Sequence, residues 1–454
     1  MRSEIYVTQT FFQGYKSMNA YKYLALALGM FVIALGFSGK VDAQEKPTTL
    51  AIMNGQVHTI AGSVIDEGDV IIEGGRIVAV GVNLAAPSGS QVIDATGKIV
   101  TPGIIAPFST LGLTEVSAVS ETNDTRTDEK FSLGAALDAA DAYNPASSLI
   151  AVNRAGGVTR AVSVPEANGF LFGGAAIMID LSGQKNSVTK HNIARSLQLG
   201  VRGANRAGGS RIGAWGIVRE MLDAAIAYAN DPVGYNKDQS EGRYTIADLK
   251  SLGGVLRAKQ SLLVRVNRAS DIRAVIKLKN DYRLKLVIVG GSEAWREAKA
   301  LAAANIPVIL DPFFNLPAEF EDLSASLKNA AFLDEAGVLI AFYNPPSGSH
   351  NLRLLTQQAG NAVANGLSFQ AALAALTLNP ATIYGLGSEL GSIEVGKIAD
   401  IVVWDADPLE LSSDPEVVII NGDIQSLQNR QNLLLQRYKD LQRGDLPFAY
   451  RGGE

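Results

Sequence analysis

The sequence predicts an α/β protein: a (β/α)8 TIM barrel accompanied by a composite β-sandwich formed from both ends of the chain. In residues 101–385, short apolar runs alternate with helical segments, as they do in βαβ units of a parallel sheet. Short strand pairs around turn residues precede this region in residues 44–100 and follow it in residues 386–428. The chain also has 45 glycines in 454 residues, which favours many tight strand–helix connections.

The barrel prediction depends on the elements expected in the middle of the chain. Strands are expected at residues 104–106, 158–164, 175–179, 262–266, 284–289, 306–310 and 338–342. Helices are expected at residues 212–229, 246–258, 270–280, 293–304, 318–334, 351–365 and 369–378. Seven or eight such repeats fit a barrel. A doubly wound open sheet is the alternative, and the lack of a Gly-rich phosphate loop after the first strand disfavours it.

The two terminal β regions are expected to form one domain. Residues 48–60 alternate around an Asn54-Gly55 turn, and residues 70–80 have the pattern of a hairpin. Residues 391–405 and 416–424 supply further short strands. Neither group has enough strands to be stable alone, so the two are expected to combine. A helix and tail, residues 429–454, follow them.

The first 43 residues are expected to be a signal peptide. An apolar run of 16 residues, LALALGMFVIALGFSG, follows Lys22, and small residues ending at Ala43 supply a cleavage site before Gln44. The run is short for a membrane span. Met1 and Met18 are both candidate starts. We therefore expect an exported protein, located in the periplasm and not held in a membrane after cleavage.

The composition restricts the chemistry of any site. There is no cysteine, which excludes disulfides, thiolate metal sites and cysteine nucleophiles. The only histidines are His58, His191 and His350, whereas hydrolytic zinc sites draw two or three histidines together. The net charge of −5 gives no basic footprint, so no nucleic-acid partner is expected.

Four stretches resemble the amidohydrolase superfamily of metal-dependent hydrolases, especially its secreted imidazolonepropionase-like members. They are IDATGKIVTPGII, LLVRVNRASDIRAVIKL followed by LKLVIVGGSEAW, GSHNLRLLTQQAGNAVANGLSFQAALAALTLNPATIYGL, and GSIEVGKIADIVVWDADPLE. The last two are the most specific. The resemblance implies a metal-binding (β/α)8 barrel flanked by a composite β-sandwich, and hydrolysis of carbon–nitrogen, non-peptide bonds.

The resemblance also implies where metal ligands would stand. Relatives hold one or two divalent ions, such as zinc, with an HxH pair on the first strand, single histidines on the fifth and sixth strands and an aspartate on the eighth. These positions fall here on Phe108 and Thr110, on Arg265 or Asn267, on Gly290 or Gly291, and on Tyr343 or Asn344. No fourth-strand ligand was recognised. We therefore expect no metal and no other cofactor.

The remaining candidates at the barrel mouth are Arg265, Asn267, Asp311, Tyr343, Asn344 and His350. Arg265 suits a carboxylate or phosphate ligand, but the favoured expectation is that it fills the former metal position and pairs with Asp311. His350 is expected to bond a loop or cap the following helix. The stretch GVRGANRAGGSR is read as a solvated linker rather than an anion-binding loop.

Several functions stay open at this point. The favoured one is an exported amidohydrolase-fold protein whose catalysis has been lost. The alternatives are a non-catalytic binding protein for a small molecule at the barrel mouth, a subunit that partners an active relative, and a hydrolase with a rearranged site. The apolar stripe of the C-terminal helix is expected to pack on the chain's own barrel, and contact with a neighbour in a homo-oligomer or hetero-oligomer is the alternative.

Overall fold

The fold is taken from a computed structural model, which describes residues 49–125, 127, 133–166, 169–238, 244–314 and 316–439. The predicted signal peptide, residues 1–43, and the tail beyond residue 439 lie outside the described residues. No helix within the described ranges combines the length and the apolar character needed to cross a bilayer.

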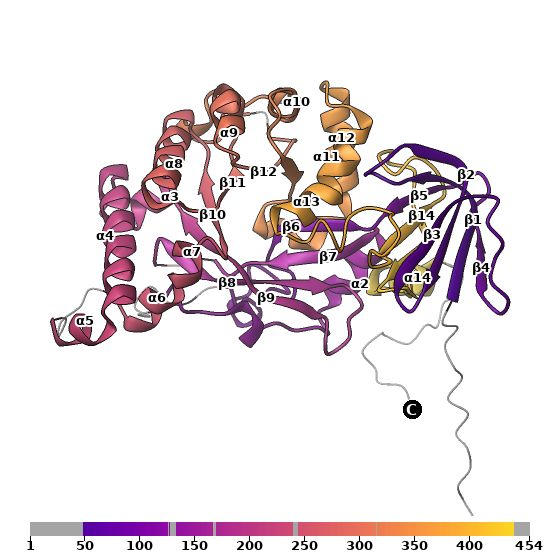
Figure 1. Ribbon diagram of the computed structural model, residues 1–454, viewed down its shortest axis with the longest axis horizontal. Helices are drawn as coiled ribbons and strands as arrows, with labels where there is room; N and C mark the ends of the chain where they lie inside the picture. The colour runs from indigo at the N-terminus through magenta and orange to yellow at the C-terminus, as the bar shows by residue number, and fades with distance from the viewer. Residues whose placement is uncertain are drawn as a thin grey trace, which may run out of the picture. The chain divides into compact units, whose positions relative to one another are not determined.

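The central element is an eight-stranded sheet that is nearly closed into a barrel (Figure 1). Its strands run in sequence order, and the two edge strands lie next to each other. They are β6 (Ile104–Ser109), β7 (Val158–Ser163), β8 (Phe172–Asp180), β9 (Val188–Gln198), β10 (Ser261–Val266), β11 (Leu286–Gly290), β12 (Val308–Leu310) and β13 (Ile340–Phe342). The predicted α/β class and a barrel-like sheet are therefore confirmed.

The third strand of this sheet, β8, departs from the uniform parallel barrel that the sequence predicted. It pairs antiparallel with both β7 and β9, whereas every other neighbouring pair is parallel. The described residues of the connections on either side of β8 contain no helix, and only a helix-length crossover returns a chain for parallel pairing. Strand β9 was also missed by the sequence prediction, because its first half is mostly polar and is not buried.

Helices cover the outer face of the β10–β13 half of the sheet (Figure 1). The α-helices are α2 (Ser148–Ala155), α3 (Gly200–Asn205), α4 (Arg211–Asn230), α5 (Pro232–Asp238), α6 (Ile246–Ser251), α7 (Gly253–Leu256), α8 (Ala269–Tyr282), α9 (Ala298–Ala303), α10 (Asn329–Glu335), α11 (Leu355–Ala364), α12 (Phe369–Leu376), α13 (Leu378–Ile383) and α14 (Arg430–Tyr438). Short 3-10 turns are η1 (Ser120–Thr122), η2 (Ala139–Asp141), η3 (Ala294–Glu297), η4 (Phe320–Asp322) and η5 (Pro346–Leu354).

One expected helix is wrong. Residues 318–334 contain only the η4 turn and then α10. The carboxylates of η4 bond elsewhere: Glu321 accepts from the amide of Val201, and Asp322 accepts from Ser292 Oγ. These bonds hold the segment against the barrel mouth, where a continuous helix would not reach.

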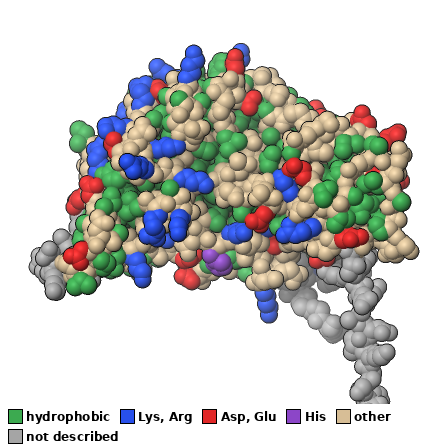
Figure 2. Space-filling model, in the orientation of Figure 1, with side chains coloured by type: hydrophobic (Ala, Val, Ile, Leu, Met, Phe, Trp, Pro, Cys, Tyr) green, Lys and Arg blue, Asp and Glu red, His purple; other side chains and the backbone are tan. Residues whose placement is uncertain are grey.

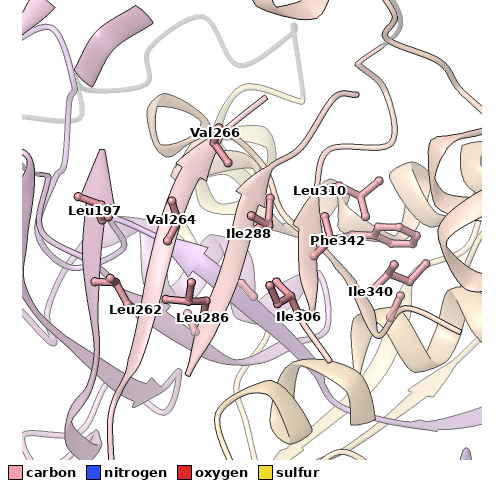
Figure 3. Packing of buried hydrophobic residues seen from close by; sticks show 14 of the residues in the cluster. Leu197, Leu262, Val264, Val266, Leu286, Ile288, Ile306, Leu310, Ile340 and Phe342 are labelled. Atoms are coloured by element: carbon pink, nitrogen blue, oxygen red, sulfur yellow. The ribbon is translucent and has the colours of Figure 1, made fainter. Parts of the chain in front are cut away.

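Strand alternation divides the barrel's apolar residues between two cores. Leu262, Val264, Leu286 and Ile288 point to the helices, and Figure 3 shows them with their neighbours in this outer cluster. The intervening residues, such as Leu263, Val287, Ile309 and Ala341, form a separate inner cluster. Side chains therefore fill the barrel. Full burial of each aliphatic side chain contributes about 1.5–3 kcal/mol to the stability of the fold.

The second eight-stranded sheet joins the two ends of the chain. Its N-terminal strands are β1 (Thr49–His58), β2 (Val64–Glu73), β3 (Arg76–Val82), β4 (Gln91–Asp94) and β5 (Ile99–Pro102); its C-terminal strands are β14 (Ile401–Trp404), β15 (Pro415–Ile420) and β16 (Asp423–Ile424). Pairing of β5 with both β1 and β14 connects the two groups. We call this the composite sheet; the more specific sandwich arrangement stays a prediction.

Charge is unevenly distributed over the visible face. Apolar and acidic side chains cover most of the composite-sheet region in Figure 2, whereas most of the basic side chains lie over the barrel part of the chain. The formal net charge of −5 therefore does not describe the barrel region of this face.

Candidate functional site at the barrel mouth

The carboxyl ends of the parallel strands meet at one mouth of the barrel, and a cavity of ≈ 220 Å³ lies there. Its wall contains residues from the ends of β9 to β13 and from the loops that follow them. They are Gln198, Leu199, Arg202, Arg265, Val266, Asn267, Val289, Gly290, Ser292, Asp311, Phe314, Ala318, Glu319, Glu321, Asp322, Tyr343 and Pro345. We call this space the mouth cavity.

Five of the residues singled out in the sequence line the mouth cavity, and four do not. Arg265, Asn267, Gly290, Asp311 and Tyr343 are in its wall. The others are Phe108, Thr110, Asn344 and His350. Phe108 lies directly behind the wall, where it contacts both Arg265 and Tyr343.

Thr110 and Asn344 are buried and bonded away from the cavity. The Thr110 amide donates to Ser349 Oγ at 2.9 Å, and Asn344 Nδ2 donates to the Asn351 carbonyl at 2.7 Å. His350 is exposed on η5. The expectation that His350 caps the next helix is wrong, because α11 is preceded by Leu354 at its N-cap and has no side-chain cap.

An aromatic–arginine cluster fills the inner side of the mouth. The rings of Phe108 and Tyr343 meet edge to face, with centroids 5.8 Å apart and an interplanar angle of 84°. The guanidinium carbon of Arg265 lies 5.7 Å from the centre of the Phe108 ring. Both aromatic side chains are buried. A cation over an aromatic face is attracted by the ring quadrupole, and the attraction strengthens when water is excluded.

The expected ion pair between Arg265 and Asp311 is not formed. Asp311 Oδ1 instead accepts from the backbone amide of Phe313 at 2.9 Å. Among the described residues, no carboxylate lies within ion-pairing distance of the Arg265 guanidinium. The prediction failed because the Phe108 ring gives the cation a neighbour that a sequence does not reveal.

Carboxylates also line the cavity. Burial raises the pKa of Asp311, and burial likewise raises the pKa of Glu321 and of Asp322. Glu321 is nevertheless ion-paired with Arg211 at 2.8 Å. In the described part of the chain, the side-chain donor to Asp322 is the hydroxyl of Ser292, at 2.8 Å. Positive and negative groups therefore both line the mouth cavity.

The arginine-rich stretch was wrongly interpreted as a solvated linker. It forms α3 and the start of α4, and Arg202 lines the mouth cavity. Arg206 Nη1 donates to the Phe170 carbonyl at 3.0 Å, and Arg211 pairs with Asp271 and Glu321. Gln198 was also missed, because β9 was missed. The feature that would have revealed Gln198 is the stretch 194–198, which is buried and leads into a turn at a glycine.

The side chains at this mouth do not fit the divalent-metal site that the resemblance implies. Phe108, Thr110, Arg265 and Tyr343 supply a ring, a hydroxyl bonded to Ser349, a cation and a buried phenol. Gly290 has φ +96°, and a Cβ there would lie 2.5 Å from Asn267 Oδ1, so a histidine at this position would be strained. Among the described residues, no three His, Cys, Asp or Glu side chains are grouped to hold a metal.

Comparison with known proteins identifies the family. The model of the amidohydrolase family matches residues 324–432. The amidohydrolase TasK of Hapsidospora irregularis is 25% identical over 403 residues, which cover 79% of this chain but only 40% of that protein. A solved prolidase bound to N-methylphosphonate-L-proline is 17% identical with a TM-score of 0.54, over 84% of this chain and 100% of its own, which is a likeness of fold alone.

The strongest of these likenesses is to a solved amidohydrolase from Thermotoga maritima. It is 30% identical, with a TM-score of 0.74, over 83% of this chain and 99% of that one. A match of this identity over nearly the whole of a solved relative confirms the resemblance seen in the sequence. The chain belongs to the amidohydrolase superfamily.

Proposed function

We propose that this chain is a non-catalytic member of the superfamily that binds a small molecule in the mouth cavity. One observation carries the proposal: at the strand ends, Phe108, Arg265 and Tyr343 pack against one another and supply no metal donor set. Catalysis in this superfamily depends on a metal-bound water, which needs such donors. A cavity with charged walls remains beside the cluster and supports a binding role.

Metal content and hydrolysis test the loss of catalysis. The purified chain is incubated with zinc, dialysed and analysed for metal, and hydrolysis of amides and cyclic amides is measured with and without chelator. Substoichiometric zinc and no chelator-sensitive hydrolysis are expected. One zinc ion per chain retained through dialysis, together with hydrolysis that chelator abolishes, would overturn the proposal.

Binding is tested separately by the melting temperature of the chain in a library of small metabolites. Compounds that raise the melting temperature of the parent are expected to lose the effect in Arg265→Met and keep it in Arg219→Met, a change on the exposed face of α4. If no compound acts through Arg265, the binding role is wrong even where catalysis is absent.

A hydrolase with a rearranged site is the second candidate, and Asp311 favours it. A buried carboxyl with a raised pKa is suited to proton transfer, and Asp311 faces the mouth cavity. This candidate predicts chelator-insensitive cleavage of a carbon–nitrogen bond that both Arg265→Ala and Asp311→Ala abolish. Unchanged activity in both variants would remove the mouth cavity from the reaction.

Export and assembly are further proposals. The apolar leader supports export, which is tested by fractionation and by finding Gln44 as the mature N-terminus. Leu433, Leu435 and Tyr438 of α14 are exposed, which supports pairing with a second copy or an active relative. Light scattering of the chain alone and mixed with a co-exported amidohydrolase tests this.

A further inference from the structure

Two guanidinium groups line the mouth cavity without forming an ion pair in the described part of the chain. Arg202 and Arg265 both line it, and both also line a small adjoining space together with Phe108, Glu166 and Arg206. Among the described residues, neither cation has a carboxylate within ion-pairing distance. Arg211, which lies nearby in sequence, differs because it forms ion pairs with both Asp271 and Glu321. The free pair therefore marks a place for an anion.

The same cavity contains carboxylates without a cationic partner. Asp311 accepts one backbone amide and a long bond of 3.5 Å from Gln358 Nε2. Asp322, which is buried, accepts from Ser292 Oγ. Among the described residues, no lysine or arginine is within ion-pairing distance of either carboxylate. Burial without a cation is what raises the pKa of Asp311 and of Asp322.

The two sets of charges both lie near the hydroxyl of Tyr343. Burial is the main cause of its raised pKa, and Asp311 and Asp322 raise the pKa further. Arg265 and Arg202 act on the same hydroxyl in the opposite sense. All four charges are therefore close enough to act on one phenol in the cavity wall. A ligand in the cavity beside Tyr343 would meet both positive and negative groups.

The size and the remaining wall restrict the ligand further. A volume of ≈ 220 Å³ is below the roughly 300–1,000 Å³ of pockets for drug-sized ligands, so the occupant is small. Leu199, Val289 and Phe314 add an apolar part to the wall. An anion alone would leave Asp311 and Asp322 unpaired, and a cation alone would leave both arginines unpaired.

We propose that the mouth cavity binds a small zwitterion, an α-amino acid with an apolar side chain. Arg265 and Arg202 bind its carboxylate, Asp311 with Asp322 binds its ammonium group, and the apolar wall holds the side chain. This inference rests on the proposed binding function and specifies its ligand. Guanidinium groups suit carboxylates because their donors match both oxygens.

Three probes of similar shape separate the contributions of the two charges. Calorimetric titration of the mature chain uses L-leucine, L-leucinamide, which lacks the carboxylate, and 4-methylpentanoate, which lacks the amine. L-Leucine is expected to bind about tenfold or more tightly than either analogue, as a charge-assisted hydrogen bond contributes about 1.5–3 kcal/mol.

Two variants test which side chain binds the carboxylate of leucine and which binds its ammonium group. Arg265→Met is expected to weaken the binding of leucine by about tenfold or more, to an affinity near that of the parent for leucinamide. Asp311→Asn is expected to weaken the binding of leucine by a similar factor, to an affinity near that of the parent for 4-methylpentanoate. The matched control, Arg219→Met, is expected to bind leucine like the parent. Circular dichroism establishes that each variant is folded.

The outcomes separate the ligand class from the binding function. If leucine does not bind, or binds no better than both analogues, the zwitterion proposal is overturned. The binding function still stands in that case if another compound raises the melting temperature through Arg265. If 4-methylpentanoate binds as well as leucine, the site is an anion site and the role given to Asp311 is wrong.

Discussion

Arg160 on β7 donates from Nε to Asp400 Oδ2 at 2.6 Å, and both side chains are almost completely buried. Arg160 Nη2 also donates to Asn421 Oδ1 at 2.6 Å, and Asn421 Nδ2 donates to Asp180 on β8 at 3.0 Å. This network joins the barrel to the composite sheet. Asp400 is the aspartate of the GKIADIVVW stretch, so part of that signature fixes the two sheets to each other.

Removing the cation from this network is expected to be costly. Arg160→Met leaves Asp400 buried without its charged partner, and breaking a buried pair in this way costs about 3–5 kcal/mol. Urea unfolding measures the loss. The control is Lys277→Met, which breaks the exposed pair with Asp281 and is expected to cost about 0.5 kcal/mol or less. Similar losses in the two variants would mean that the Arg160 network does not stabilise the junction.

The backbone at Gly290 is expected to reject any side chain. Gly290→Ala combines a left-handed φ of +96° with a Cβ 2.5 Å from Asn267 Oδ1, and a loss of about 1–3 kcal/mol is expected. Gly337→Ala provides the matched control, because its φ is +80° and nothing lies within 4 Å of the added Cβ. Thermal unfolding should show a larger loss for Gly290→Ala; equal losses would show that the Asn267 contact has no cost.

The Phe108 ring is expected to support both of its neighbours. Phe108→Ala removes a buried ring from Tyr343 and from the Arg265 guanidinium, and a loss of about 3–5 kcal/mol is expected. Phe108→Leu keeps most of the apolar volume but not the ring face, and its loss is expected to be smaller. Chemical unfolding compares the two. A loss below about 1 kcal/mol for Phe108→Ala would mean that the mouth collapses freely around the missing ring.

Stability is expected to depend on pH through Asp311. Because burial raises its pKa above that of an unfolded aspartate, the folded chain binds this proton more tightly. Its contribution to the free energy of unfolding therefore falls as pH rises through the folded pKa. Asp311→Asn removes this titration and keeps an oxygen for the Phe313 amide. The variant should gain stability relative to the parent as pH rises above about 4, the usual pKa of an aspartate. A difference that is constant over this range would contradict the assignment.

The apolar strands were the part of the fold that sequence patterns predicted well. The runs ending near Arg265, Gly290 and Tyr343 are buried on both faces, so their positions followed directly from hydrophobicity. Strand β9 was missed because residues 189–192 are polar, and Gln198 was missed with it. The reversal of β8 had a signal, the LSGQKNS turn, which is too short to contain a crossover helix.

The arrangement within the site could not be predicted in the same way. Whether Arg265 faces a carboxylate or a ring depends on which neighbouring strand end comes closer, and hydrophobic periodicity carries no such information. The role of Arg202 depends on α3, a helix of six residues that begins at a glycine with φ +65°. Contacts of this kind arise from the packing of strand ends far apart in sequence.

The positive charge of Arg265 belongs to the polypeptide itself. A guanidinium keeps its charge throughout the physiological pH range, and a chelator cannot extract it as it extracts a bound ion. An anion site built on Arg265 is complete as soon as the chain has folded, with no loading step. Its strength would then be independent of the zinc supply around the cell, on which a metal-loaded relative depends.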